Sequence, residues 1–254
     1  MKETGTLVLD KNRKGDAMQM SDDLILSNPP ARSGETVQER TYQRLRRSIM
    51  TGAVSPGVAL TIRGLAESLQ VSPTPIREAL RRLSAERGLA VLDNRRVMVP
   101  EMTVQKFEEL LTLRVALETH AAERALPYIS DKIIDELEAL DGELDQALEN
   151  NRYEDTIITN QAFHERLFQA NPHQQAMPMI ESVWLQLGPF LRLAAVNLKD
   201  FYHIDRHKEA IVALRTRDSK ALRTAIESDI RDGIGHIGRE GPLRAFVEAQ
   251  GVLP

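Results

Sequence analysis

Apolar residues recur every three or four positions along most of this chain, which is the spacing of an amphipathic α-helix. After Pro100 the pattern predicts six consecutive helices, separated by short polar segments. The expected ranges are 103–126, 131–149, 154–170, 174–197, 201–216 and 218–238. No segment in this region alternates with the period of a strand, so we expect an all-α bundle that is large enough to enclose a pocket.

Before Pro100 the pattern is shorter and mixed. It predicts three helices that begin near residues 37, 62 and 73, and the first has Thr36 with Glu39 three residues later, a capping-box pattern. Two apolar runs on either side of residues 93–96 then predict a hairpin with a charged tip. The expected fold class is therefore mostly α, with a small β wing beside the N-terminal helices.

The third helix, in the segment VSPTPIREALRRL, has arginines on its outward face. Ser72 or Thr74 is expected to cap it, and Pro75 is tolerated within a first helical turn. Its isoleucine, alanine and leucines form an inward stripe, whereas Thr74, Arg77 and Arg81 project outward together. Two short helices joined by a tight turn, the second with such a face, predict a helix-turn-helix that reads DNA in the major groove.

Charge is distributed unevenly along the chain. Between Thr36 and Val99 there are eleven arginines, no lysine and five acids, a balance of +6. Residues 100–254 have a balance of −9, and the whole chain has a net charge of −4. A compact positive segment on an acidic body is typical of an electrostatic DNA-binding surface. The alternative is a salt-bridged interface between two domains.

The composition excludes several other classes of protein. There are no cysteines, so disulfides, thiolate chemistry and cysteine-ligated metals are excluded. No apolar run approaches the roughly 20 residues that a membrane span needs, and the N-terminal segment lacks the apolar core of a signal peptide. We therefore expect a cytoplasmic protein without a membrane partner.

Over residues 42–99, the segments GAVSPGVAL and LAESLQVSPTPIREALRRL resemble the winged helix-turn-helix of the GntR family of bacterial transcription regulators. The resemblance implies binding to double-stranded DNA through the second helix, the start of the third helix and the wing. The positions concerned are Arg63, Ser72, Thr74, Arg77, Arg81, Arg95 and Arg96. Pro73 stands where the family usually has arginine, and Arg96 where the wing usually has glycine, so a relative's operator sequence does not carry over.

Several helices after Pro100 place polar groups on the face that should be buried. Burying such a group without a partner costs about 1–3 kcal/mol, so we expect these groups to meet one another, a ligand or a metal. They are Arg114 and Glu118 in the first helix, Asn160 and His164 in the third, His203 and His207 in the fifth, and Asp229 in the last. The alternatives are hydrogen-bonded core histidines and, for Arg114 with Glu118, an exposed bridge within one helix.

Three segments in this region, LRVALETHAAERA, NQAFHERLFQANPH and the residues after His207, resemble the FCD ligand-binding domain of FadR-type regulators, and six helices indicate the VanR-like branch. Many such domains hold a divalent metal. The resemblance assigns its ligands to Asn160, His164, His207 and Asp229. Asn160 and Asp229 replace the usual Asp and His, but two imidazoles with oxygen ligands still suit Zn, Ni or Mn. His203 or His236 would compensate for the weaker Asn160.

The same resemblance implies that the effector is a small carboxylate metabolite. We expect its carboxylate at the metal or against Arg114, because a guanidinium that faces an apolar cavity binds carboxylates through two hydrogen bonds. Glu118 would hold Arg114 in orientation. Arg192 is a second candidate for the carboxylate, with an exposed position as the alternative.

These interpretations divide the chain into four parts. Residues 1–35 are expected to be a disordered or loosely packed arm, and residues 241–254 a C-terminal tail. Residues 36–100 would form the winged helix-turn-helix domain, and residues 101–240 the all-helical effector-binding domain.

The expected function is a ligand-responsive transcription regulator that binds a pseudo-palindromic operator as a homodimer and is released or repositioned by a small organic acid. Two alternatives remain. One is a metal-dependent enzyme that acts on a small acid in the bundle pocket, which requires three protein ligands and an open metal position. The other is a metabolite-binding scaffold whose DNA contacts are vestigial.

Overall fold

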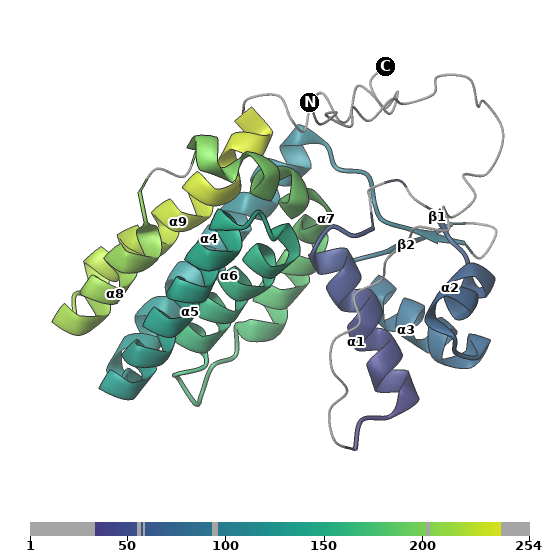
Figure 1. The fold of residues 1–254 in the computed structure, drawn as a ribbon, viewed down its shortest axis with the longest axis horizontal. Helices are drawn as coiled ribbons and strands as arrows, with labels where there is room; N and C mark the ends of the chain where they lie inside the picture. The colour runs from purple at the N-terminus through teal and green to yellow at the C-terminus, as the bar shows by residue number, and fades with distance from the viewer. Residues whose placement is uncertain (1–33, 55–56, 58, 93–95, 202–203, 240–254) are drawn as a thin grey trace.

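The computed structural model describes residues 34–54, 57, 59–92, 96–201 and 204–239, and for residues 192–201 and 236–239 it describes the backbone alone. Two bodies lie side by side, an N-terminal head that holds the sheet and a larger helical bundle (Figure 1). The fold is mostly α with a small antiparallel sheet, which confirms the predicted class. The predicted N-terminal arm, except for its last two residues, and the predicted C-terminal tail lie outside the described residues.

The head is built from three short helices and three two-residue strands. The helices are α1 (Val37–Met50), α2 (Ile62–Leu69) and α3 (Pro73–Ala85), and the strands are β1 (Ala59–Leu60), β2 (Ala90–Val91) and β3 (Val97–Met98). The strands are antiparallel in the order β1-β3-β2, and the β2–β3 pair is the predicted wing. Its tip, residues 93–95, is not among the described residues. Thr36 caps α1 as predicted, because its side chain accepts a hydrogen bond from the Glu39 N–H at 3.2 Å.

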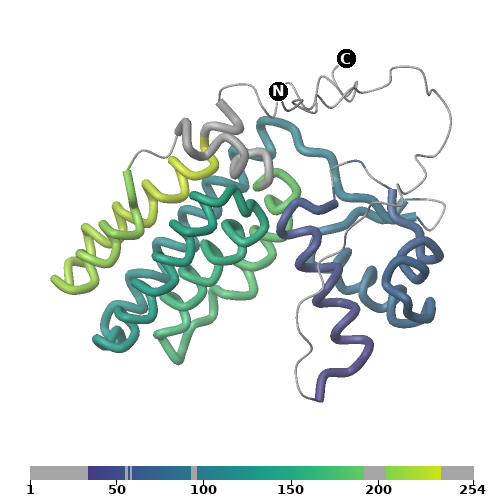
Figure 2. The backbone as a smooth tube through the Cα atoms, in the orientation of Figure 1, coloured from purple at the N-terminus to yellow at the C-terminus, as the bar shows by residue number. Residues whose placement is uncertain are grey.

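The bundle contains all six predicted helices. They are α4 (Val104–Ala125), α5 (Asp131–Glu149), α6 (Tyr153–Phe168), α7 (Met177–Phe201), α8 (Arg206–Thr216) and α9 (Ser219–Arg239), with a 3-10 turn at Leu126–Tyr128. The largest difference from the prediction is the start of α8, at residue 206 instead of 201. Asp205 sets this start, because its side chain accepts a hydrogen bond from the Lys208 N–H at 3.0 Å. Figure 2 traces α4 and α9 along each other, with α5 and α6 beside them.

The head and the bundle share one apolar core, and they meet where α7 packs against α1. Two glycines permit the close approach. A Cβ at Gly188 on α7 would lie 2.5 Å from the Cα atom of Met50, and a Cβ at Gly88 would lie 2.5 Å from Leu185. At Gly188 the neighbouring atoms are backbone and cannot move aside, so the junction depends on the absence of a side chain there, whereas at Gly88 the flexible Leu185 side chain would have to shift.

Polar contacts centred on Glu86 reinforce this junction. The side chain of Glu86 accepts a hydrogen bond from Tyr42 at 2.7 Å, and its backbone oxygen accepts one from Ser182 on α7 at 3.0 Å. Arg46 on α1 pairs with Glu181 on α7 at 3.0 Å. The end of α3, the middle of α1 and the first half of α7 are therefore tied together. No helix within the described ranges has the length and apolar character needed to span a membrane.

Candidate functional site

The N-terminus of α3 projects into solvent from the head. Ser72, Thr74 and Arg77 are exposed, and Arg77 has no hydrogen bond or ion pair with any residue that the structure describes. Ser72 is the N-cap residue, one of the two predicted positions, but its side chain makes no capping hydrogen bond. Pro75, at the third helical position, has no N–H to donate, which removes one of the two backbone partners that an N-cap side chain can use.

Two further arginines predicted to contact DNA are exposed but held by acids on their own helices. Arg63 pairs with Glu67 at 2.9 Å, and Arg81 pairs with Glu78 at 2.6 Å. Exposed bridges of this kind contribute little to stability, because water and salt screen them. A phosphate group can therefore replace these acids as the partner of either arginine.

A shallow groove between α2 and α3 brings part of this surface together. Arg63 and Arg77 both line it, together with Pro73 and Gln70. Arg96 is exposed at the start of β3, and Arg95 lies outside the described residues. The groove thus brings together Arg63 from α2 and Arg77 from α3, whereas Arg96 is exposed but is not part of its lining.

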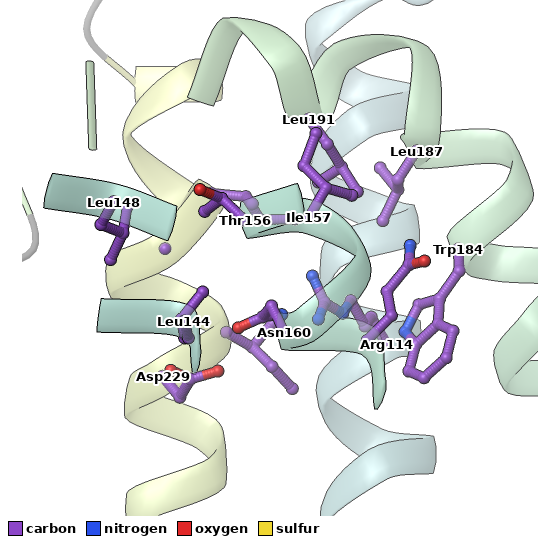
Figure 3. A pocket seen from close by; sticks show the side chains of 14 residues that line it. Arg114, Leu144, Leu148, Thr156, Ile157, Asn160, Trp184, Leu187, Leu191 and Asp229 are labelled. Atoms are coloured by element: carbon purple, nitrogen blue, oxygen red, sulfur yellow. The ribbon is translucent and has the colours of Figure 1, made fainter. Parts of the chain in front are cut away.

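A second candidate site is a cavity inside the bundle, between α4, α5, α6, α7 and α9 (Figure 3). Its polar lining is Arg114, Thr156, Asn160, Gln161 and Asp229. The remaining lining is mostly apolar and consists of Leu144, Leu148, Ile157, Trp184, Leu187, Leu191, Ile230, Gly233 and Ile234. A cavity of this composition, with a few polar groups on an apolar wall, is typical of a small-molecule site.

Arg114 and Glu118 form a buried ion pair at the edge of this cavity. Arg114 is 5 % exposed and Glu118 is 0 % exposed, and the Arg114 Nε atom donates to Glu118 Oε1 at 2.6 Å. Trp184 Nε1 donates to the same oxygen at 2.7 Å. In Figure 3 the guanidinium of Arg114 lies between Asn160 and Trp184. Within the described part of the chain, no residue bonds to its two terminal nitrogens, which are left for a ligand.

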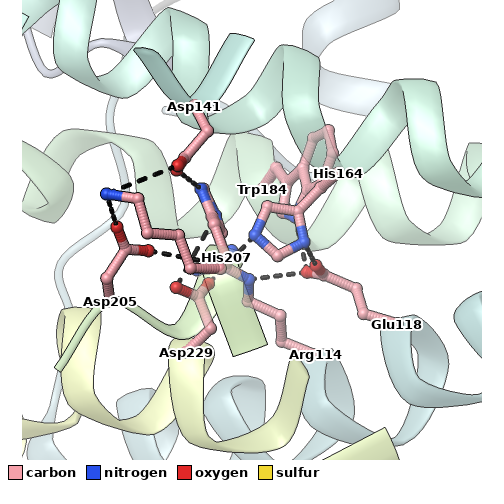
Figure 4. Close-up of polar contacts among 9 residues, drawn as sticks. Arg114, Glu118, Asp141, His164, Trp184, Asp205, His207 and Asp229 are labelled. Atoms are coloured by element: carbon pink, nitrogen blue, oxygen red, sulfur yellow. Dashed lines mark hydrogen bonds and ion pairs between the residues drawn. The ribbon is translucent and has the colours of Figure 1, made fainter. Parts of the chain in front are cut away.

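Two histidines continue this arrangement into a buried ionic network (Figure 4). His164 lies between two carboxylates: its Nε2 atom is 3.0 Å from Asp229 Oδ2, and its Nδ1 atom is 3.2 Å from Glu118 Oε2, with imperfect alignment. His207 Nδ1 is 3.2 Å from Asp141 Oδ1. We call the six residues Arg114, Glu118, His164, Asp229, His207 and Asp141 the buried network.

The carboxylates determine the protonation of His164. Burial by itself lowers the pKa of His164, but the interactions with Asp229 and Glu118 outweigh burial and raise this pKa from 6.5 to about 9. Burial likewise acts to raise the pKa of Glu118, but Arg114 and His164 bring it below its ordinary value. At neutral pH His164 is therefore an imidazolium ion between two carboxylates.

Three members of the buried network present possible metal ligands to one point. Ligand atoms of His164, His207 and Asp229 all lie within 4.8 Å of one another. His207 Nε2 is buried 3.6 Å from Asp229 Oδ1 and has no hydrogen-bond partner among the described residues. An ion bound at about 2.0–2.2 Å keeps neighbouring ligand atoms roughly 3.0–3.6 Å apart, and the distances from the two histidines to the Asp229 carboxylate fall in this range. Two imidazoles and a carboxylate are a donor set that divalent metals accept.

The outer contacts of the two imidazoles also suit a metal. Glu118 and Asp141 lie at the Nδ1 atoms of His164 and His207, the position from which carboxylates orient metal-binding histidines. Asn160, the fourth predicted ligand, is half-buried and lines the cavity with Asp229.

Three predicted side chains, those of Arg192, His203 and His236, are not among the described ones. Neither Asp141 nor Trp184 was identified from the sequence as part of the site. A signal for Asp141 was present, because it falls on the apolar stripe of α5 with Ile134, Leu137 and Leu144.

Comparisons with known proteins match both parts of the chain. Residues 37–99 match the family model described as bacterial regulatory proteins, gntR family, and residues 109–232 match the FCD domain. The HTH-type transcriptional regulator McbR of Escherichia coli (strain K12) is 30% identical over 197 residues, which cover 75% of this chain and 87% of that protein.

Two further similarities point the same way. The gluconate operon transcriptional repressor of Bacillus subtilis (strain 168) is 27% identical over 206 residues, 76% of this chain and 82% of the repressor. The solved structure described as E. coli McbR/YncC superimposes with a TM-score of 0.73 at 27% identity, over 79% of this chain and 96% of that one.

The buried network generates a prediction about stability. Replacing Glu118 by Gln leaves two buried cations, Arg114 and His164, without their shared carboxylate, and breaking a buried pair in this way costs about 3–5 kcal/mol of unfolding free energy. Urea unfolding measures this loss. The matched control is Glu123→Gln on the same helix, where the bridge to Arg223 is partly exposed and the loss stays below about 1 kcal/mol. Equal effects for the two variants would contradict the central role of Glu118.

Proposed function

Because the chain belongs to the GntR family of bacterial regulatory proteins and carries an FCD domain, we propose how its two sites work together. The protein is a ligand-responsive, DNA-binding transcription regulator. Its relatives are regulators and not enzymes, so the interpretation as a metal-dependent enzyme is set aside.

In this proposal α3 enters the major groove of the operator. Thr74 and Arg77 face the base edges, and Arg63 binds a backbone phosphate after releasing Glu67. The exposure of all three side chains supports this assignment. The remaining contacts come from Ser72, Arg81, Arg95 and Arg96. Two copies of the chain bind together, with their α3 helices in successive major grooves about 34 Å apart, so the operator is pseudo-palindromic.

The bundle cavity binds the effector, a small organic acid. The observation that carries this proposal is the buried guanidinium of Arg114, whose terminal nitrogens lie at the cavity without a partner among the described residues. A carboxylate can take two parallel hydrogen bonds from such a group. Glu118 holds Arg114 in position through its Nε atom, and Trp184 fixes Glu118 in turn.

We further propose that His164, His207 and Asp229 hold a divalent metal, Zn, Ni or Mn, with Asn160 as a neutral fourth ligand. When bound, the ion supplies a positive charge that attracts the anionic effector. His164 has to release its Nε2 proton first, because a metal binds only the deprotonated ring nitrogen. Glu118 and Asp141 then keep the two rings in orientation through their Nδ1 atoms.

The helix α7 is placed to couple the two sites, because it has one face on the cavity and another on the head. Trp184, Leu187 and Leu191 line the cavity, whereas Leu185 and Gly188 contact the head. Pro189, inside the helix, cannot donate a hydrogen bond to the preceding turn, which makes this point of α7 easier to bend. An effector that favours one position of α7 thereby favours one position of the head, provided that its affinity differs between the two.

The DNA-binding proposal is tested by Arg77→Ala. Loss of a base-contacting arginine should weaken operator binding about 5- to 150-fold, equivalent to about 1–3 kcal/mol, and should relax the preference for operator over scrambled DNA. Gel-shift titration on the regulator's own promoter measures both quantities. Arg215→Ala removes the same charge from the exposed surface of α8 and should leave both unchanged. Unaltered sequence preference in R77A would refute the role of Arg77.

The metal proposal is tested by Asp141→Asn. Removing the carboxylate that orients His207 should weaken Zn²⁺ binding about 10- to 100-fold. The fluorescence emission of Trp184, the only tryptophan in the chain, reports Zn²⁺ binding. Trp184 donates a hydrogen bond to Glu118, and Glu118 in turn contacts the proposed ligand His164. Glu143→Gln, at an exposed position of the same helix and outside the clusters of possible metal ligands, is the matched control and should bind Zn²⁺ like the unmodified protein. If Zn²⁺ binds equally to both variants, or to neither variant nor the parent, the metal assignment fails.

The coupling proposal is tested by Gly188→Ala. A methyl group there would overlap the backbone of α1 and push the head away from α7, so we expect effector binding to persist while its influence on operator affinity falls at least about fivefold. Calorimetry measures the first quantity and gel shift the second. Gly142→Ala on α5 adds the same methyl group into open space, and its operator response should stay normal. A normal response in G188A would show that α7 is not the coupling element.

A further inference from the structure

The cavity has a polar side and an apolar side. Figure 3 shows the charged and amide groups of Asp229, Asn160 and Arg114 along one side, with Leu144 and Trp184 beside them. Leu148, Leu191 and Leu187 lie along the other side, where the one labelled polar residue is Thr156. From this division we infer the chemical class of the effector: a monocarboxylate with a compact apolar body, such as a short branched-chain acid, in place of a polyhydroxylated or multiply charged acid. The inference rests on the proposed function, because it assumes that this cavity is the effector site.

The polar side can hold one carboxylate. Arg114 is the one cationic side chain among the described residues that line the cavity, and its terminal nitrogens have no protein partner there. Gln161 adds a neighbouring donor, because its Nε2 atom is buried without a hydrogen-bond partner among the described residues. Two such donors match the oxygens of a single carboxylate. Without a bound metal, a second carboxylate would meet Asp229 or the leucines, where no protein cation balances its charge.

The apolar side of the cavity determines which chemical groups the effector can carry besides its carboxylate. Leucine and isoleucine side chains offer no hydrogen bond, so each hydroxyl group placed against them loses its bonds to water without replacement. Such a loss lowers affinity about tenfold for each hydroxyl group. A sugar acid carries several hydroxyl groups and is therefore excluded, whereas an alkyl group gains affinity by leaving water.

The size of the cavity limits the length of the alkyl group. Its volume is about 70 Å³. Since one water position takes up roughly 10–15 Å³ on this measure, the space corresponds to roughly five to seven water-sized groups. Isovalerate, with seven non-hydrogen atoms, lies at the upper end of this range.

The experiment titrates the full chain with four probes, with and without added Zn²⁺, and follows Trp184 emission and operator affinity. Isovalerate is the expected ligand. Isovaleramide has the same shape without the charge, succinate has a second carboxylate, and gluconate has hydroxyl groups in place of the apolar body. We expect isovalerate to bind at least about tenfold more tightly than each of the others and to change operator affinity.

A variant on the apolar side of the cavity tests whether the protein selects monocarboxylates with an alkyl body or binds any small organic acid. Leu148→Asn should weaken isovalerate binding at least about tenfold and leave the weak binding of gluconate and succinate unchanged or improved. Leu148 is half-buried, so the substitution is expected to fold. Val212→Asn, at an exposed position of α8, is the control and should bind isovalerate normally.

The outcomes distinguish the two levels of the proposal. If gluconate or succinate binds most tightly and changes operator affinity, the inferred class is overturned while the proposed function stands. If isovaleramide binds as well as isovalerate, recognition of a carboxylate is overturned. If isovalerate binds as expected but operator affinity does not change, the class stands and the proposed function fails. If none of the three acids binds, both fail.

Discussion

The requirement that buried charges be paired shapes the centre of the bundle. Arg114, Glu118, His164, Asp229, His207 and Asp141 come from α4, α5, α6, α8 and α9. Each of these side chains is at most 5 % exposed, and removing one from water without a partner costs several kcal/mol. The contacts between them therefore fix how five helices lie against one another, in a way that leucine contacts alone do not.

The hydrogen bonds of the buried network are incomplete. Glu118 Oε1 receives hydrogen bonds from Arg114 and Trp184, whereas Glu118 Oε2, His164 Nδ1 and His207 Nε2 have no hydrogen-bond partner among the described residues. The terminal nitrogens of Arg114, at the cavity, also lack a partner among these residues. A ligand or an ion that supplies those partners gains interactions that the protein has already oriented. Binding should therefore concentrate on the cavity side. The adjoining α7 places this event one helix away from the head.

The hydrophobic pattern was sufficient to predict the helices, because their positions follow from local spacing. It predicted all six bundle helices. The boundaries that moved most are those of α7, which begins three residues later and ends four residues later than expected, and the start of α8, which the cap at Asp205 places five residues later. The pairing of His207 with Asp141 could not be predicted, because it joins residues 66 positions apart. The approach of Gly188 to Met50 is equally nonlocal: a glycine inside a helix shows in the sequence, but its neighbour does not. The scarcity of backbone N–H groups at the start of α3, in contrast, shows in the sequence, because Pro73 and Pro75 both lack one.

The prolines at the start of α3 have a consequence for how the head binds DNA. A helix N-terminus normally offers four unpaired N–H groups, which often bind a phosphate. Pro73 and Pro75 remove two of the four, and Thr74 retains the one between them. Anchoring to phosphates then has to come from side chains. The head supplies eleven arginines and no lysine, and a guanidinium binds a phosphate oxygen pair with directed hydrogen bonds. The loss of backbone donors and the abundance of arginine therefore belong together: in this head, arginine side chains bind the phosphates that backbone N–H groups at a helix N-terminus would otherwise bind.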